Sequence, residues 1–436
     1  MKTNYITLLL VALLSISTVV AQQTPAKAQS KTIAITNATA HLGNGQVIEK
    51  SLIVFENGKL TNVADMSMAK MDLGGMEVIN AEGKHVYPGF IVPNSTLGLV
   101  EIGAVRATDD DSEIGSWNPH IRSLIAYNAE SKIVESMRPN GVLLGQITPR
   151  GGRVSGTSSI VQFDAWNWED AAIKVDDGIH MNWPNSFSRG RWWLGEDPGW
   201  KVNKNYDGQV SEIKDFFYNT KAYMKGNKAT KHLPYEATHG LFDGTKTLYV
   251  HVDDEKGIID AVNVCITHGV QRMVIVGGYE AHKVSDLLKK NNVSVLLQRV
   301  HSRPSNTDDD YDMPFKLAKL LVDKGVTVGL ESSGQMERMN SRNLPFYAGT
   351  TVAYGLSKEQ ALQLITGNTA KILGIDDQYG TLEIGKSATL FISEGDALDM
   401  RTNNLSHAFI DGRQLSLETH QTELWKRYSE KLKTQD

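Results

Sequence analysis

The feature that most restricts the fold is a regular alternation of short β-rich runs and amphipathic stretches between residues 247 and 330. Alternation of this kind predicts βα units and a parallel sheet. Because four runs follow one another in regular order, it favours a closed barrel over an open sheet. The four runs are Thr247–Val252, Arg272–Val276, Val293–Leu297 and Val326–Leu330.

Both ends of the chain have a different texture. From Lys31 to Val86, short β-rich runs alternate with turns such as Asn57-Gly58, which is the signature of hairpins. A similar texture returns between Tyr379 and Arg413. We therefore predict one small β domain, built from residues 22–87 and 379–413, around a barrel of residues 88–378. A C-terminal helix would follow over 414–436.

The span from about residue 183 to 223 interrupts the βα rhythm and is rich in Trp, Phe and Tyr. Long insertions in compact domains are usually functional, so this one predicts a lid or an interface. For the stretch after Asp207, a helix packed on the barrel wall is the alternative.

The N-terminus resembles a secretory leader. Lys2 precedes an apolar run from Ile6 to Val20, and Val19-Val20-Ala21 is a small-residue cleavage site. We expect cleavage between Ala21 and Gln22, which predicts a periplasmic or secreted protein with no membrane anchor after cleavage. The run is shorter than the roughly 20 apolar residues that a spanning helix needs.

Composition narrows the class of protein. The chain has 436 residues, 41% hydrophobic and 22% charged, which is typical of a folded globular protein. Its net charge of −5 gives no basic surface for nucleic acid. Cys265 is the single cysteine, so an internal disulfide is excluded and we predict a buried helix position for it.

Two segments carry a family resemblance. The first is Val86-Tyr-Pro-Gly-Phe-Ile-Val-Pro-Asn-Ser-Thr96; the second runs from Asn343 to Gly374 and continues into Gly380-Thr-Leu-Glu-Ile-Gly-Lys-Ser-Ala-Thr389. They resemble the amidohydrolase superfamily, and within it the imidazolonepropionase-like proteins exported by Bacteroidetes-type bacteria. The resemblance implies a (β/α)₈ TIM-type barrel plus a small β-sandwich domain built from both chain ends.

The same resemblance shows a degenerate metal motif. In the superfamily the first strand usually reads Pro-Gly-Phe-Ile-Asp-x-His-x-His, but here Val92, Asn94 and Thr96 stand at the Asp and His positions. The sixth-strand histidine position falls at Gly277. Amides and neutral hydroxyls are not strong zinc ligands. A binuclear metal centre is therefore not expected.

Three ligand-capable residues remain at family positions. The resemblance matches His251 to the fifth-strand histidine, His180 to an inward position on the fourth strand and Glu331 to the eighth-strand acid. It implies that His180 and His251 hold at most one metal and that His251 and Glu331 are catalytic, with Glu331 as a third ligand or the general base. The alternative for both histidines is a structural, hydrogen-bonded role.

Substrate contacts are expected from two places. Asn94 and Thr96 lie where the family has ligands, and the loop after the seventh strand carries Arg299, His301 and Arg303. Guanidinium groups there could hold an anionic group by bidentate bonds; a solvated rim is the alternative. The glycine-rich stretch from Pro149 to Ser159 matches no phosphate-binding motif and predicts a turn that shapes the pocket.

Two functions remain open at this point. The first is a hydrolase of non-peptide C–N bonds in a cyclic amide or dipeptide-like small molecule, assisted by one divalent metal, most plausibly zinc. The second is a metal-free, catalytically inactive relative that binds a ligand or an active amidohydrolase partner. Either could form a homo- or hetero-oligomer.

Overall fold

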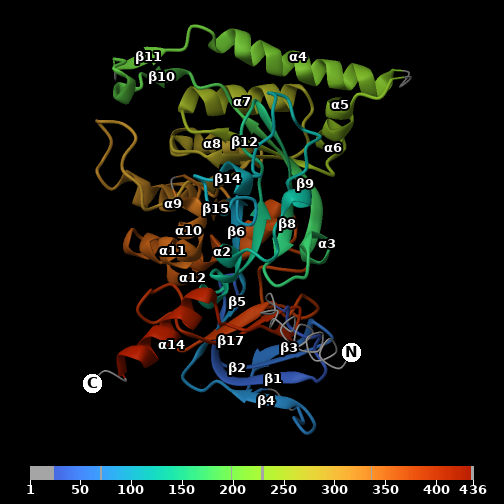
Figure 1. The fold of residues 1–436 in the computed structure, drawn as a ribbon, viewed down its shortest axis with the longest axis vertical. Coiled ribbons are helices and arrows are strands. Elements are labelled where there is room, and N and C mark those ends of the chain that lie inside the picture. Colours follow the sequence, from blue (N-terminus) through green and yellow to red (C-terminus); the bar gives the residue numbers. More distant parts are fainter. Residues whose placement is uncertain (1–23, 69–70, 198, 227–229, 335, 434–436) are drawn as a thin grey trace, which may run out of the picture.

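A computed structural model describes residues 24–68, 71–197, 199–226, 230–334 and 336–433. It contains a barrel sheet, a separate β domain and a two-stranded arm. Figure 1 shows the β domain at one end of the molecule, the long helix α4 at the opposite end and the barrel between them. The predicted leader, residues 1–21, lies outside the described residues. Within the described ranges, no helix is both long and apolar enough to cross a membrane.

The barrel is an eight-stranded sheet whose last strand contacts its first, so the sheet is nearly closed. Its strands are mostly buried along their whole length, as expected when helices cover the outer face. The predicted fold class is confirmed. In spatial order the strands are β6 (Phe90–Ser95), β7 (Val142–Ile147), β8 (Val154–Gln162), β9 (Ala172–Asn182), β12 (Thr247–Val252), β13 (Met273–Gly277), β14 (Ser294–Leu297) and β15 (Val328–Leu330).

One strand departs from the all-parallel pattern, because β8 is antiparallel to both β7 and β9. Only residues 148–153 join β7 to β8, and a parallel crossover needs a dozen or more residues. Gly151 and Gly152, with φ of 82° and 62°, make the reversal. The turn predicted over residues 149–159 is thus confined to residues 148–153, at the carboxyl end of β7, and residues 154–159 belong to β8.

The β domain joins both chain ends in one sheet, where β5 pairs with β16 and aligns Pro88 with Leu390. Its core includes an edge-to-face contact between Phe55 and Phe409. The strands are β1 (Ile33–His41), β2 (Val47–Glu56), β3 (Lys59–Asp65), β4 (Glu77–Asn80), β5 (His85–Pro88), β16 (Leu390–Ser393), β17 (Leu405–Ile410) and β18 (Arg413–Gln414).

Helices pack around the barrel through apolar stripes. In α7 (Glu255–Thr267), Ile258, Ala261, Val262 and Cys265 lie on one buried face, and Asp254 caps the N-terminus through Gly257 N–H. The other α-helices of the barrel and C-terminus are α2 (Lys132–Glu135), α3 (Trp168–Ala171), α8 (Ser285–Lys290), α9 (Met313–Asp323), α10 (Glu337–Asn340), α11 (Leu344–Ala353), α12 (Lys358–Gln363), α13 (Gly367–Leu373) and α14 (His420–Lys433). The short 3₁₀ helices are η1 (Arg106–Thr108), η2 (Ser123–Ala126), η3 (Arg138–Asn140), η5 (Ala281–Val284) and η6 (Ser341–Asn343).

The aromatic insertion has two parts. The first is an arm of β10 (Phe187–Arg189), η4 (Trp192–Leu194) and β11 (Trp200–Val202), whose tryptophans are exposed. The second is α4 (Tyr206–Lys225), followed by α5 (Leu233–Thr238) and α6 (Gly240–Asp243). Val210, Ile213 and Phe217 of α4 are buried at helical spacing, so this part is a helix packed on the barrel.

A buried ion cluster ties the barrel to the β domain. Asp164, which follows β8, accepts hydrogen bonds from Arg138 Nη1 of η3 at 2.9 Å and from Arg413 Nη1 of β18 at 2.8 Å. Arg138 and Asp164 are almost fully buried. Removing one partner of such a cluster leaves uncompensated buried charge, which is far more costly than losing a surface pair.

We predict that Asp164→Ala lowers the free energy of unfolding by about 3–5 kcal/mol, because Arg138 is then left buried without its carboxylate. Glu394→Ala, which removes an exposed partner of Lys84, is the control and should cost less than about 1 kcal/mol. Denaturant unfolding of the two variants measures both values. Equal losses would show that the cluster does not hold the two domains together.

Candidate active site

Five of the predicted site residues meet at the carboxyl ends of the barrel strands, where barrels of this kind carry their sites. Asn94 lies on β6, with Thr96 just beyond its end, His180 lies on β9, His251 on β12, and Glu331 directly follows β15. All but His251 are buried, and His251 is partly exposed. A chain of hydrogen bonds connects them.

The first part of the network surrounds Glu331. Its Oε2 accepts hydrogen bonds from Asn94 Nδ2 at 3.2 Å and Ser333 N at 2.7 Å, and its Oε1 accepts one from the Ser333 hydroxyl at 2.7 Å. Ser333 is partly exposed. The buried carboxylate therefore reaches the barrel mouth through one hydroxyl group.

The second part is organised by Arg150, which comes from the turn between β7 and β8. Its Nη1 donates to Asn94 Oδ1 and its Nη2 to the Asn94 carbonyl oxygen, each at 2.9 Å. Nη2 also donates to both carboxylate oxygens of Glu337 at 3.2 Å. Thr96 donates to Glu337 Oε1 through its N–H and its hydroxyl, each at 2.8 Å. A guanidinium cation thus occupies the centre of the mouth.

The third part fixes the two histidines. Asp177 accepts from Tyr249 OH at 2.8 Å, from Gln146 Nε2 at 2.9 Å and from the Ser158 hydroxyl at 2.7 Å. Because Ser158 gives its proton to Asp177, its oxygen accepts from His180 Nε2 at 3.0 Å. His180 Nδ1 then accepts from His251 Nε2 at 2.9 Å. In this network both histidines carry their proton on Nε2, and the lone pair of His251 Nδ1 remains available as an acceptor.

Both imidazoles are neutral in the folded protein. Burial lowers the pKa of His251 to about 3, and the nearby charge of Arg150 adds to the effect. Burial, and then the neighbouring His251, lower the pKa of His180 well below its ordinary value. Neither ring carries charge near neutral pH.

The pKa of Glu331 is shifted in the opposite direction, upward. Burial raises its pKa to about 7, although the Ser333 hydrogen bonds favour the ionised form. A carboxyl group with a pKa near neutrality exchanges protons readily at physiological pH.

These residues do not fit a metal ion. Across the described ranges, no group of three or more His, Cys, Asp or Glu side chains could hold one. His180 Nδ1 and His251 Nε2 are 2.9 Å apart and share a proton, whereas two nitrogens on one tetrahedral zinc lie about 3.3 Å apart. Both ring nitrogens of His180 are committed, Nε2 as donor to Ser158 and Nδ1 as acceptor from His251, and Arg150 adds a positive charge beside the site. The predicted ligand pair is therefore a hydrogen-bonded pair.

At the end of the sixth strand, a carboxylate fills the space that Gly277 leaves. A Cβ atom on Gly277, which has φ of 92°, would meet Asp253 Oδ1 at 2.5 Å. Asp253 lies two residues after His251 and was not among the predicted residues. Its carboxylate needs the absence of a side chain at position 277.

The predicted loop residues lie elsewhere. His301 Nε2 bonds to the Thr350 hydroxyl at 2.7 Å and its ring packs edge-on against Tyr347, both on α11. Arg299 also lies beside Tyr347, where its charge lowers the tyrosine pKa against the larger effect of burial. Arg303 is exposed. Their part in substrate binding remains a prediction.

Sequence reasoning missed the residues that connect the network: Arg150, Glu337, Gln146, Ser158 and Asp177. Arg150 had a usable signal, since it follows the end of a strand at the face where sites gather. The other four have none, because they meet only through the pairing of β7, β8 and β9 and the return of α10 to the mouth.

Comparisons with known proteins agree with this geometry. Residues 224–415 match the model of the amidohydrolase family. An amidohydrolase from Thermotoga maritima MSB8 has the same fold, with a TM-score of 0.76 and 23% identity over 88% of this chain and 99% of that one.

Two further relatives cover a similar share of the chain. A 5'-deoxyadenosine deaminase of Methanobrevibacter smithii is 22% identical over 387 residues, which is 80% of this chain and 81% of that protein. A Xaa-Pro dipeptidase structure superimposes with a TM-score of 0.54 and 14% identity over 88% of this chain and all of that one. At these identities, the structural likeness shows the fold alone.

Glu331 predicts an unusual pH dependence of stability. Its folded pKa of about 7 lies above the unfolded value near 4.5, so its contribution to stability is complete below about pH 4.5 and is lost as the pH rises through 7. Relative to Glu331→Gln, the wild type should lose about 2.5 kcal/mol of unfolding free energy between pH 5 and 8. Denaturant unfolding at several pH values measures the difference.

His180 and His251 change the free energy of unfolding with the opposite sign. Their folded pKa values are lowered, so they reduce stability as the pH falls below about 6.5. They are present in both proteins and cancel in the comparison. A difference between wild type and variant that does not change with pH would contradict the raised pKa of Glu331.

Proposed function

We propose that this amidohydrolase-family protein hydrolyses a non-peptide C–N bond in a cyclic amide or dipeptide-like small molecule, using side chains of its own. The observation that carries the proposal is the buried carboxyl group of Glu331, which has a pKa of about 7 and connects to the barrel mouth through Ser333. The names of the relatives support the bond type, because a deaminase and a dipeptidase both break C–N bonds.

The proposed step begins with a water molecule at the mouth, next to the Ser333 hydroxyl. As the water oxygen attacks the electrophilic carbon, its proton passes to Ser333 Oγ while the Ser333 proton passes to Glu331. The C–N bond of the tetrahedral intermediate then breaks, and the proton returns along the same path to the leaving nitrogen. Atoms and charges balance, and Glu331 ends ionised as it began.

Arg150 supports this step through its field. Its bonds to Asn94 and Glu337 hold the positive charge in place, so no reorganisation is needed when negative charge develops on the attacked group. His251 is held by His180 through Nε2, which leaves its neutral Nδ1 as a hydrogen-bond acceptor. In this proposal Arg150 is a positioning residue, and His251 orients the substrate or water.

A binding protein without activity is the second candidate. The hydrogen bonding at the mouth favours this candidate. Glu331, Asn94, Arg150 and Glu337 all bond to one another within the protein, so their polar groups do not need a substrate as partner. Such a protein could serve an active amidohydrolase in a homo- or hetero-oligomer. The leader-like N-terminus supports a periplasmic or secreted location for either candidate, and the terminal motifs support the imidazolonepropionase-like subtype.

We predict that Glu331→Gln and His251→Ala each lower kcat/KM by at least about 10²-fold, because Glu331 takes up the proton and His251 orients the substrate or water. For the wild type, kcat/KM should rise through about pH 7 as Glu331 ionises. The assay uses a panel of cyclic amides and N-acyl amino acids, with and without added zinc. Glu394→Gln, in the β domain, is the control.

The outcomes separate the candidates. Activity that Glu331→Gln leaves intact would place the catalytic centre elsewhere. No hydrolysis by the wild type on any member of the panel, together with binding of some of them, would favour the binding protein.

A further inference from the structure

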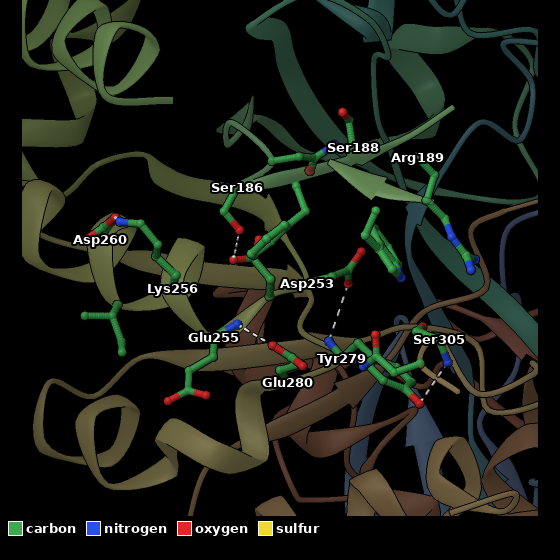
Figure 2. Close-up of a pocket in the computed structure, with 16 residues that line it drawn as sticks. Ser186, Ser188, Arg189, Asp253, Glu255, Lys256, Asp260, Tyr279, Glu280 and Ser305 are labelled. Carbon is green, nitrogen blue, oxygen red and sulfur yellow. Dashed lines mark hydrogen bonds and ion pairs between the residues drawn. The ribbon is translucent and has the colours of Figure 1, made fainter. Parts of the chain in front are cut away.

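A second concave site lies beside the network, beneath the aromatic arm. It is a cavity of about 1010 Å³ between the arm, the ends of β12 and β13 and the loop before α9. His180, His251 and Glu331 are not among its lining residues. Figure 2 shows Asp253 in the middle of this cavity, between the arm residues Ser186, Ser188 and Arg189 on one side and Tyr279 on the other.

Three aromatic side chains form walls of the cavity. Phe187 and Trp200 come from the two strands of the arm and are 49% and 54% exposed. Tyr279 follows β13, where its hydroxyl donates to Asp309 Oδ2 at 2.6 Å and accepts from Ser305 N at 3.0 Å. The Tyr279 side chain is thereby fixed and is only 2% exposed, and the Arg189 guanidinium lies 4.7 Å from the centre of the Trp200 ring. Phe187 and the uncovered part of Trp200 offer apolar area to the cavity.

Most of the charged groups in the cavity are already compensated. Asp260 pairs with Lys256 at 2.7 Å, and Glu280 pairs with Lys283 at 2.7 Å. Asp254 caps α7 and accepts the Ser186 hydroxyl at 2.7 Å. These carboxylates have protein partners and do not call for a ligand.

Asp253 is different. Its Oδ1 accepts one long hydrogen bond, from Tyr279 N at 3.4 Å, and no cation of the described residues forms an ion pair with it. The carboxylate is open to solvent through the cavity, while the surrounding protein raises its pKa. Its position also requires Gly277, since any side chain there would displace it.

We propose that this cavity binds a small organic ammonium ion with an apolar or aromatic body. Asp253 supplies the counter-charge, and the exposed parts of Phe187 and Trp200 supply the apolar surface on which the body of the ligand packs. A metal ion is not the occupant, because no group of three ligand-capable side chains exists among the described residues. The site does not depend on the proposed hydrolysis, since binding needs only the cavity.

The test is calorimetric titration of the full mature protein with 4-phenylbutylammonium at pH 7.5, compared with the neutral 4-phenylbutanol. Wild type should bind the ammonium with a dissociation constant in the millimolar range or below, at least about 10-fold tighter than the alcohol. Asp253→Asn should weaken the ammonium by at least about 10-fold and leave the alcohol unchanged. Trp200→Ala should weaken both probes.

Asp376→Asn, at an exposed carboxylate after α13, is the control and should change neither affinity. The wild-type preference between the two probes tests the site even if a variant fails to fold. The proposal would be overturned by equal affinity for the two probes. It would also be overturned if the ammonium did not bind at 5 mM, about five times the weakest expected dissociation constant, or if folded Asp253→Asn bound the ammonium as tightly as the wild type.

Discussion

The guanidinium group of Arg150 is the charge around which the barrel mouth is arranged. It binds the side chain and the backbone carbonyl of Asn94 and the carboxylate of Glu337, so it connects β6, the β7–β8 turn and α10. Asn94 adopts φ of 49°, a conformation that asparagine tolerates better than most side chains. The positive charge of Arg150 is paired with the Glu337 carboxylate.

This arrangement depends on the reversed strand β8. Because β8 runs antiparallel, the short turn that carries Arg150 lies at the carboxyl end of the barrel, and Ser158 faces Asp177 across the sheet. Asp177 accepts a hydrogen bond from Ser158, Ser158 accepts one from His180, and His180 accepts one from His251. One buried carboxylate thus sets the tautomers of two rings. The cost of burying these polar groups is offset because each has a partner.

The local pattern of apolar residues and turns predicted much of the fold. The features that it did not predict depend on strand pairing between residues far apart in the sequence. The strands that carry His251 and Gly277 follow from apolar runs with helices between them, and the joining of both chain ends follows from their hairpin texture. Strand β8 and its reversal were hidden because its sequence, Val-Ser-Gly-Thr-Ser-Ser-Ile-Val-Gln, is buried but lacks the apolar run by which the other strands were predicted. The connecting residues Gln146, Ser158 and Asp177 are ordinary polar residues until the register brings them together.

The central claim is that the mouth of this barrel works with an attached cation and a hydrogen-bonded histidine pair. The most direct test is anomalous scattering at the zinc edge from crystals of the mature protein grown with excess zinc. The account predicts no peak between His180 and His251, with Arg150 still bonded to Asn94. A fully occupied zinc bonded to both imidazoles, with Arg150 displaced, would contradict it.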